Sequence, residues 1–299
     1  MSGIASPLNL LSALGDMLSN DFMQYAFTAG TAMALLGGFV GYFVILRRST
    51  FAGEALSHVA FAAALGAVLF GFAPLLGMFV ITVGVALGMG SLGKQARTDD
   101  VTIGVVLAWV LGLGALFLSI YTSSPGGGSN GQIGVNVLFG SILGLNLDTT
   151  KTAIAVAAAA ILVLLAIARP LLFASIDPAV AVARGVPVRL LGSAFLVLIA
   201  LTVAESVQVV GALLVLALLV MPAAIAQRWT TRPYRGLFLA AALGVAFTWI
   251  GLTIGYFEPY PVSFFITTLA VGTYFATLLW QQLRTWSMRS TPRREPASG

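Results

Sequence analysis

The most constraining feature of this sequence is a succession of long apolar runs. A helix that crosses a bilayer needs roughly 20 apolar residues. We expect about nine such spans, over residues 22–46, 55–72, 75–93, 101–121, 152–168, 190–209, 211–226, 236–256 and 262–283. Only 8% of the residues are charged and 59% are hydrophobic, whereas a soluble domain carries about 25% charged residues. Unbroken apolar runs do not suit the alternating strands of a barrel, so the sequence predicts an all-α polytopic membrane protein.

Lysine and arginine residues fall almost entirely in alternate connections between these spans. One set of connections, with the tail that follows the last span, holds Arg47, Arg48, Lys94, Arg97, Arg169, Arg184, Arg189, Arg228, Arg232, Arg235, Arg284, Arg289, Arg293 and Arg294. The other set holds Lys151 and no arginine. Because short cytoplasmic loops are enriched in these residues, the pattern predicts an N-terminus outside and a C-terminus in the cytoplasm.

The chain divides into three expected parts. Residues 1–21 lack the basic region and cleavage site of a signal peptide, and we expect an interfacial segment there, with a short amphipathic helix over 7–18. Residues 22–283 form the expected transmembrane domain, and the basic tail 284–299 is expected to be disordered. On the outer side, 123–131 is a glycine-rich loop, and 135–145 is too short to span, which predicts a re-entrant or interfacial helix.

Glu54 and His58 are the first candidate site residues. Charged residues inside spans are costly and usually functional. The pair stands at i and i+4 near the cytoplasmic start of the second span, which places both side chains on one helix face. A carboxylate beside an imidazole suits a borderline divalent cation, and His58 is the single histidine of the chain. The alternative is that the two side chains only bond each other or a neighbouring helix.

Three further acids are candidates for a metal route. Glu205 lies within the sixth span, with Gln208 a turn away on the same face, and could coordinate a passing cation or be a packed structural acid. Glu258 lies in an outer turn, where it could help capture a cation or be a solvated loop acid. Asp100, after Asp99, precedes the fourth span, where capping of the helix explains at least one of the two.

The connection between the fifth and sixth spans, SIDPAVAVARGVPVRLL, predicts a short helix of its own. Asp177 and Pro178 are typical of a helix start, and Gly185 and Pro187 of a helix end. A short helix held at the cytoplasmic face is a surface on which a partner can push. An ordinary loop helix is the alternative.

Enzymatic machinery is not apparent in the sequence. There is no G-x-x-x-x-G-K-[ST] phosphate loop, and the absence of cysteine excludes disulfides and thiolate metal sites. A lone histidine beside Glu54 suggests no nucleophile triad. We therefore expect a transporter subunit without an ATPase site and without a permanently bound cofactor; if ATP drives transport, another subunit hydrolyses it.

Five segments, taken in order, resemble the zinc/manganese/iron permease subunits of bacterial ABC importers. They are GFVGYFVILRRSTFAGEALSHVAF, RTDDVTIGVV, VLFGSILGL, DPAVAVARGVPVRLLG and VQVVGALLVLALLVMPAAIAQRWTTRP, and the resemblance covers residues 22–283. Three positions depart from the family. Glu54 stands where an aspartate is usual, Glu258 stands near the place of an aspartate that precedes Pro-Ser-Gly, and Glu205 stands where many members are apolar.

The resemblance implies an architecture and a set of partners. It implies the permease fold of cobalamin- and metal-type importers, in the inner or plasma membrane of a bacterium. It further implies a homodimer with the pathway between its copies, two cytoplasmic ATPases beneath it, and an extracytoplasmic binding protein that delivers the metal.

The resemblance also implies residue roles. Glu54 and His58 would contact the transported ion, Zn²⁺ or Mn²⁺, with Fe²⁺ as a further option. The segment 177–189 would be the coupling helix that docks on the ATPase, through Asp177, Pro178, Val182, Arg184, Gly185, Pro187 and Arg189. Two alternatives are an iron-siderophore or cobalamin permease and a secondary transporter driven by an ion gradient. The last of these would show paired half-sequences with broken helices, which we do not find.

Overall fold

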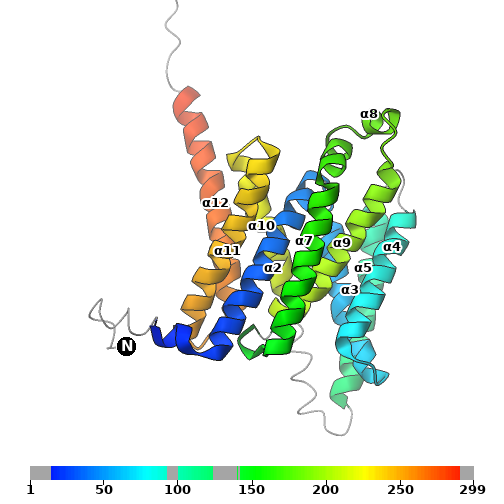
Figure 1. The fold of residues 1–299 in the computed structure, drawn as a ribbon, viewed down its shortest axis with the longest axis vertical. Helices are drawn as coiled ribbons and strands as arrows, with labels where there is room; N and C mark the ends of the chain where they lie inside the picture. The colour runs from blue at the N-terminus through cyan, green and yellow to red at the C-terminus, as the bar shows by residue number, and fades with distance from the viewer. Residues whose placement is uncertain (1–14, 93–99, 124–139, 141, 290–299) are drawn as a thin grey trace, which may run out of the picture.

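The computed structural model describes residues 15–92, 100–123, 140 and 142–289, and within these ranges the secondary structure is helical, without strands. The all-α prediction is confirmed. Most of the helices run side by side along one direction (Figure 1). Their bounds are α2 Asp21–Leu46, α3 Thr50–Leu69, α4 Pro74–Leu92, α5 Asp100–Ser123, α7 Leu147–Ile176, α8 Pro178–Ala183, α9 Val188–Val210, α10 Ala212–Trp229, α11 Pro233–Phe257 and α12 Val262–Arg289, with a 3-10 turn, η2, at Ile142–Gly144.

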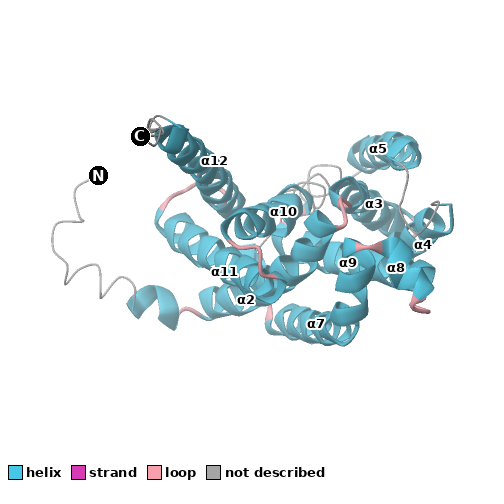
Figure 2. Cartoon of the chain, turned by 90° about the horizontal axis from the view of Figure 1, so that it is seen from above, coloured by secondary structure: helices cyan, strands magenta, loops and turns pink. Residues whose placement is uncertain are grey.

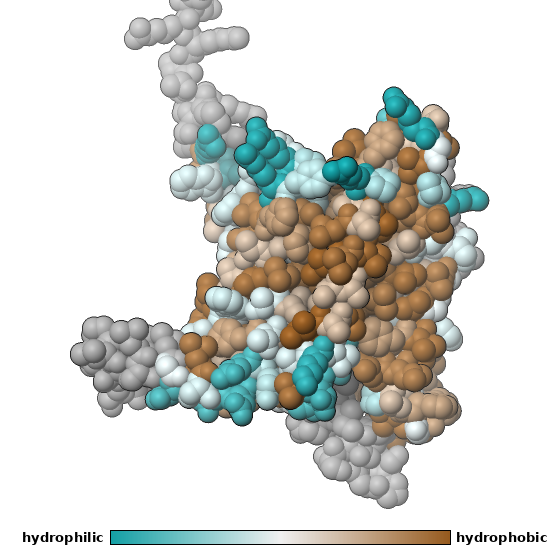
Figure 3. All heavy atoms as spheres, in the orientation of Figure 1, coloured by the Kyte–Doolittle hydropathy of each residue, from teal (hydrophilic) through white to brown (hydrophobic). Residues whose placement is uncertain are grey.

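Eight helices in the described part of the chain are long and apolar enough to cross a membrane. A ninth, α10, contributes a shorter apolar stretch over Leu214–Trp229, and Pro222 lies inside it. The count of nine spans therefore stays a prediction. On the face seen in Figure 3, apolar side chains cover the middle of the molecule, between two ends with hydrophilic residues. Large side chains such as Trp109 (67% exposed) and Leu162 (68%) lie on this surface, as expected where lipid replaces water.

Helix α2 lies in the interior of the bundle, between α7 on one side and α10 and α11 on the other (Figure 2). Its glycines permit the close approach of its neighbours. A Cβ on Gly38 would meet the backbone of Ala241 in α11, and one on Gly41 would overlap the carbonyl oxygen of Leu219 in α10. Small residues at such crossings let helix backbones pack closely where no hydrophobic effect drives association.

Helices α7 and α12 extend furthest beyond their predicted bounds. Helix α7 was expected over 152–168, but it covers Leu147–Ile176. It begins where the Asn146 side chain accepts a hydrogen bond from the Thr149 amide at 2.8 Å. It continues through Pro170 because the buried Leu171 and Ala174 hold the following turn against the core. Helix α12 continues to Arg289, so the start of the tail expected to be disordered is helical.

Several predicted segments lie partly outside the described residues. Residues 15–19 of the interfacial segment are helical, and 1–14 lie outside. The glycine-rich loop is outside from 124 onward, as are 135–139 and 141 of the predicted re-entrant segment and 290–299 of the tail. The described end of the re-entrant segment, η2, packs against α2 with Ile142 and Leu145 buried.

The basic connections gather at one end of the bundle. Helix α8, the turn between α10 and α11, and the C-terminal end of α12 all lie at the upper end in Figure 1. The start of α2 and the turn between α11 and α12 lie at the other end. We call the upper end the basic end. Its assignment to the cytoplasm stays a prediction that rests on the distribution of lysine and arginine.

Candidate functional site

Glu54 and His58 lie together in the first turns of α3, at the basic end. The Nε2 atom of His58 is 3.2 Å from Oε1 of Glu54, so the predicted pairing on one helix face is confirmed. The side chain of Glu54 is 31% exposed and that of His58 is 20% exposed. Every other residue over 52–67 is buried. The pair is thus the one opening in this stretch of an otherwise enclosed helix.

A second face of α3, next to the pair, packs against α9 and α10. At Gly53, a Cβ would stand 3.2 Å from the side chain of Leu219 in α10 and 4.0 Å from that of Ile199 in α9. Helices α4 and α5 pack along α3 as well. Because the helix is held on these sides, the carboxylate and the imidazole are left at a fixed, accessible position.

Two ligands do not complete a metal coordination shell, since first-row cations usually take four or more. Within the described part of the chain, no group of three or more His, Cys, Asp or Glu side chains could hold an ion. The structure does bring together one oxygen and one nitrogen ligand, a set that suits several first-row divalent cations.

Glu205 is fully buried in α9, at 0% exposure. Neither of its carboxylate oxygens has a hydrogen-bond partner among the described residues, and the same holds for the buried Oε1 atom of Gln208. The next residue, Ser206, donates a hydrogen bond to the sulfur of Met33 in α2 at 3.7 Å. A buried charge without a partner is costly, so an ionised Glu205 carboxylate would destabilise the interior.

Glu205 makes no hydrogen bond to the Glu54–His58 pair. Both α3 and α9 begin at the basic end (Figure 1). Glu54 stands near the start of its helix and Glu205 near the end of α9. Gly53 of α3 is level with Ile199 of α9, so at 1.5 Å per residue Glu205 stands roughly 8 Å deeper along the bundle than Glu54, at about the depth of His58.

Of the remaining predicted acids, Glu258 lies apart from the pair. Glu258 caps the C-terminus of α11 with its backbone N–H and is exposed in the turn to α12, at the end opposite the basic end. Asp100 begins α5, as expected from its predicted place at a helix start. Its side chain, like all of Asp99, lies outside the described residues.

The predicted short helix between the fifth and sixth spans is confirmed as α8. Asp177 accepts a hydrogen bond from the Val180 amide at 3.0 Å, and Pro178 occupies the first turn. At the other end, Gly185 adopts φ +77°, a left-handed conformation that favours glycine. The amide of Gly185 donates to Val182 at 2.9 Å. This C-cap stops the helix after Ala183.

Helix α8 presents a surface at the tip of the basic end (Figure 1). Ala181 is fully buried and anchors the helix, whereas Val180 is 43% and Val182 62% exposed. Arg184 is exposed beside them, and so are Pro187 and Arg189. Exposed valines and cations therefore lie side by side at this tip of the molecule.

Arg47 is a functional candidate that the sequence analysis counted only as a topology signal. It is 9% exposed, its guanidinium donates to Oγ of Ser175 at 3.3 Å, and it lies 5.6 Å from the ring centroid of Phe195. Ser175 lies in the last turn of α7, three residues before α8 begins at Pro178, and Arg47 caps the C-terminal end of α2, the helix before α3. This buried side chain therefore connects the α7–α8 junction to the turn that leads to Glu54.

Comparisons with known proteins agree with the membrane-protein fold. The sequence model of a family described as "ABC 3 transport family" matches residues 19–281. An uncharacterised membrane protein of Synechocystis sp. is 30% identical, over 85% of this chain and 89% of that protein. The manganese transport system membrane protein MntC of Halalkalibacterium halodurans is 29% identical, over 79% of this chain and 80% of its own. The structure described as PsaBC from Streptococcus pneumoniae in complex with Fab has a TM-score of 0.78 and 25% identity, covering 90% of this chain and 95% of that one.

Proposed function

Because the chain belongs to the ABC 3 transport family, we propose that it is the membrane-spanning subunit of an ATP-driven importer of a divalent transition metal. It is a multi-pass membrane permease, and relatives of similar length include a manganese transport system protein. We place it in the inner or plasma membrane of a bacterium. An extracytoplasmic binding protein delivers the ion, and a cytoplasmic ATPase pair drives its release.

The Glu54–His58 pair is the observation that carries this proposal. A carboxylate and an imidazole 3.2 Å apart offer one oxygen and one nitrogen ligand at a partly open position. Mn²⁺ is the first cargo to test, because a relative is named for it. Zn²⁺ and Fe²⁺ use the same ligand types. Two ligands bind an ion weakly, and a transport site must release what it binds.

A second copy of the permease would complete the pathway. With two copies facing each other, two Glu54–His58 pairs would supply four ligands around one route. Glu205, roughly 8 Å deeper along the bundle than Glu54, would serve as a second station for a cation, where its unpartnered carboxylate oxygens gain a counter-charge. Glu258, exposed at the opposite end, would act at the entrance.

Coupling to ATP hydrolysis would run through α8. Its exposed Val182 and Arg184 would dock on the ATPase, and a displacement of α8 would reach the start of α3 through the contact of Arg47 with Ser175. The helices would then move between two discrete packings, as in other alternating-access transitions. Hydrolysis itself belongs to the ATPase subunit.

The proposal is tested by transport with the purified permease reconstituted in vesicles with its ATPase and binding protein. We expect ATP-dependent accumulation of radiolabelled Mn²⁺, reduced by excess unlabelled Mn²⁺ and, to a degree that ranks the cargo, by Zn²⁺ and Fe²⁺. A complex that hydrolyses ATP but accumulates none of the three metals would refute metal import.

A further inference from the structure

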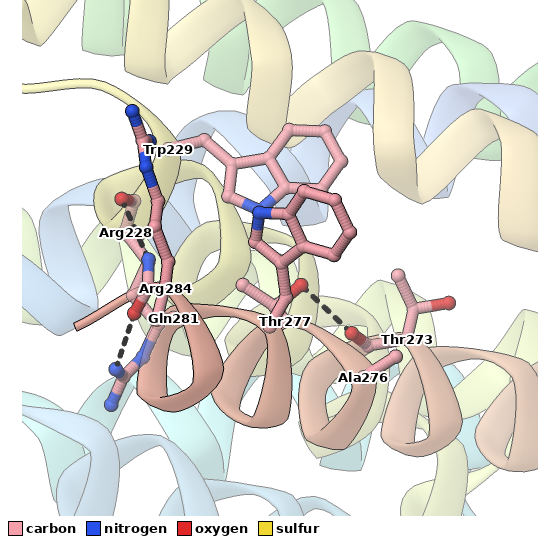
Figure 4. A pocket seen from close by; sticks show the side chains of 8 residues that line it. Arg228, Trp229, Thr273, Ala276, Thr277, Gln281 and Arg284 are labelled. Carbon is pink, nitrogen blue, oxygen red and sulfur yellow. Dashed lines mark hydrogen bonds between the residues drawn. The ribbon is translucent and has the colours of Figure 1, made fainter. Parts of the chain in front are cut away.

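A cleft of about 550 Å³ lies between the C-terminal parts of α10 and α12 at the basic end, away from Glu54, His58 and α8. Arg228 and Trp229 line it from α10, and Thr277, Trp280, Gln281 and Arg284 from α12. In Figure 4, Arg228, Gln281 and Arg284 lie at one end of the cleft, with the guanidinium groups of Arg228 and Arg284 on opposite sides of Gln281, whereas Thr273 and Ala276 lie at the other end. The cleft therefore has a cationic end and a less polar end.

Arg228 is held in place by neutral partners. Its guanidinium donates to Oε1 of Gln281 at 3.2 Å and to the Tyr274 hydroxyl at 3.4 Å, and it lies 5.4 Å from the centroid of the Tyr274 ring. Gln281 in turn donates to the Arg228 carbonyl at 3.1 Å. Among the described residues, no carboxylate oxygen lies within 4.0 Å of Arg228. The cationic end is thus oriented by its neighbours while the charge of Arg228 is left uncompensated by a described acid.

The walls of the cleft have the character of a membrane interface. Trp229 is 56% and Trp280 72% exposed, and on the same helix as Trp280 the side chains of Leu279 (59%) and Leu283 (65%) also face outward. Tryptophan is enriched where the acyl chains of a bilayer meet the headgroups. A soluble anion would gain nothing from these apolar groups, whereas a lipid would contact them with its chains.

We propose that this cleft binds the phosphate of an anionic phospholipid, with Arg228 and Arg284 on the headgroup and the tryptophans against the upper part of the acyl chains. Guanidinium groups match phosphate oxygens in geometry and charge, and basic pockets between transmembrane helices on the cytoplasmic side suit anionic headgroups. The lipid would bridge α10 and α12. The inference depends on the membrane placement of this end and not on the identity of the transported metal.

The test compares lipid binding by the purified full-length protein, measured by native mass spectrometry with phosphatidylglycerol and phosphatidylcholine of equal chain length. We expect the wild-type protein to prefer phosphatidylglycerol by roughly tenfold or more, since each of two arginines near the surface favours an anionic lipid. The double variant Arg228→Gln/Arg284→Gln should lose this preference. The matched control Arg232→Gln/Arg235→Gln removes the same charge from the neighbouring exposed turn and should keep it.

Three outcomes would overturn the proposal. The first is equal binding of the two lipids by the wild-type protein, a result that requires no variant to fold. The second is an equal loss of preference in the control double variant, which would reduce the effect to general surface charge. The third is displacement of phosphatidylglycerol by millimolar inorganic phosphate, which would make the cleft a soluble-anion site.

Discussion

Gly41 shows how a single position constrains the packing of this bundle. It lies on the buried face of α2, and a Cβ there would overlap the backbone carbonyl of Leu219 in α10. Backbone atoms do not move aside as the end of a flexible side chain does. The contact between these two helices therefore depends on the absence of a side chain at Gly41. Gly112 in α5 is the counter-example, because a Cβ there would meet nothing within 4 Å.

Gly41→Ala should destabilise the protein, and Gly112→Ala should not. We expect the first variant to lose at least about 2 kcal/mol, as forced overpacking does in a close-packed interior. The second should stay within about 1 kcal/mol of the wild type, because alanine is the better helix former. Thermal unfolding of both purified variants, followed by helical circular dichroism, measures the difference. Equal melting temperatures would show that α2 and α10 do not pack as described.

Arg47 and Arg48 show what the local sequence does not predict about a residue. Both look like cytoplasmic anchors, yet Arg47 is buried and Arg48 takes a left-handed turn with φ +56°. The partner that buries Arg47, Ser175, lies 128 residues further along the chain. Local sequence does not specify such a partner, so the connection between α7 and α3 emerges only from the fold.

At the scale of elements, α8 was predictable because local chemistry sets both of its ends. Asp177 and Pro178 start the helix and Gly185 stops it, and each acts through bonds to residues a few positions away. The bounds of α7 were not predictable in this way. Arg169 and Pro170 look like the end of a helix, but buried Leu171 and Ala174 carry it on to Ile176. Tertiary packing outweighed local preference there.

A negative charge introduced at Val182 in α8, or at Arg184 directly after it, should uncouple transport without unfolding the protein. We expect Arg184→Glu, or Val182→Asp, to lower stimulation of the ATPase by the metal-loaded binding protein by roughly tenfold, about 1.4 kcal/mol of docking free energy. Both side chains are exposed, so membrane insertion and thermal stability should stay near the wild type.

The matched control is Lys151→Glu, an equal reversal at an exposed position near the start of α7, at the other end of the bundle. It should leave coupling intact. Normal stimulation in both α8 variants, with the complex assembled, would show that the helix is an ordinary connection.

At the scale of the whole molecule, the acids are spread along the bundle instead of forming one cluster. Sequence spacing predicted the Glu54–His58 pair, because residues at i and i+4 share a helix face. It did not predict that Glu205 stands fully buried and roughly 8 Å deeper along the axis than Glu54. Helical periodicity shows which face a residue is on, but not which helix covers that face or at what depth.

The central claim is that the Glu54–His58 pair lines the route of a divalent metal, and ATP-driven Mn²⁺ uptake by the reconstituted complex tests it most directly. Glu54→Asp keeps the carboxylate and should retain uptake within about tenfold of the wild type. Glu54→Gln and His58→Ala each remove one of two metal ligands and should abolish uptake while the complex still assembles and hydrolyses ATP. Wild-type uptake rates in both of these variants would contradict the account.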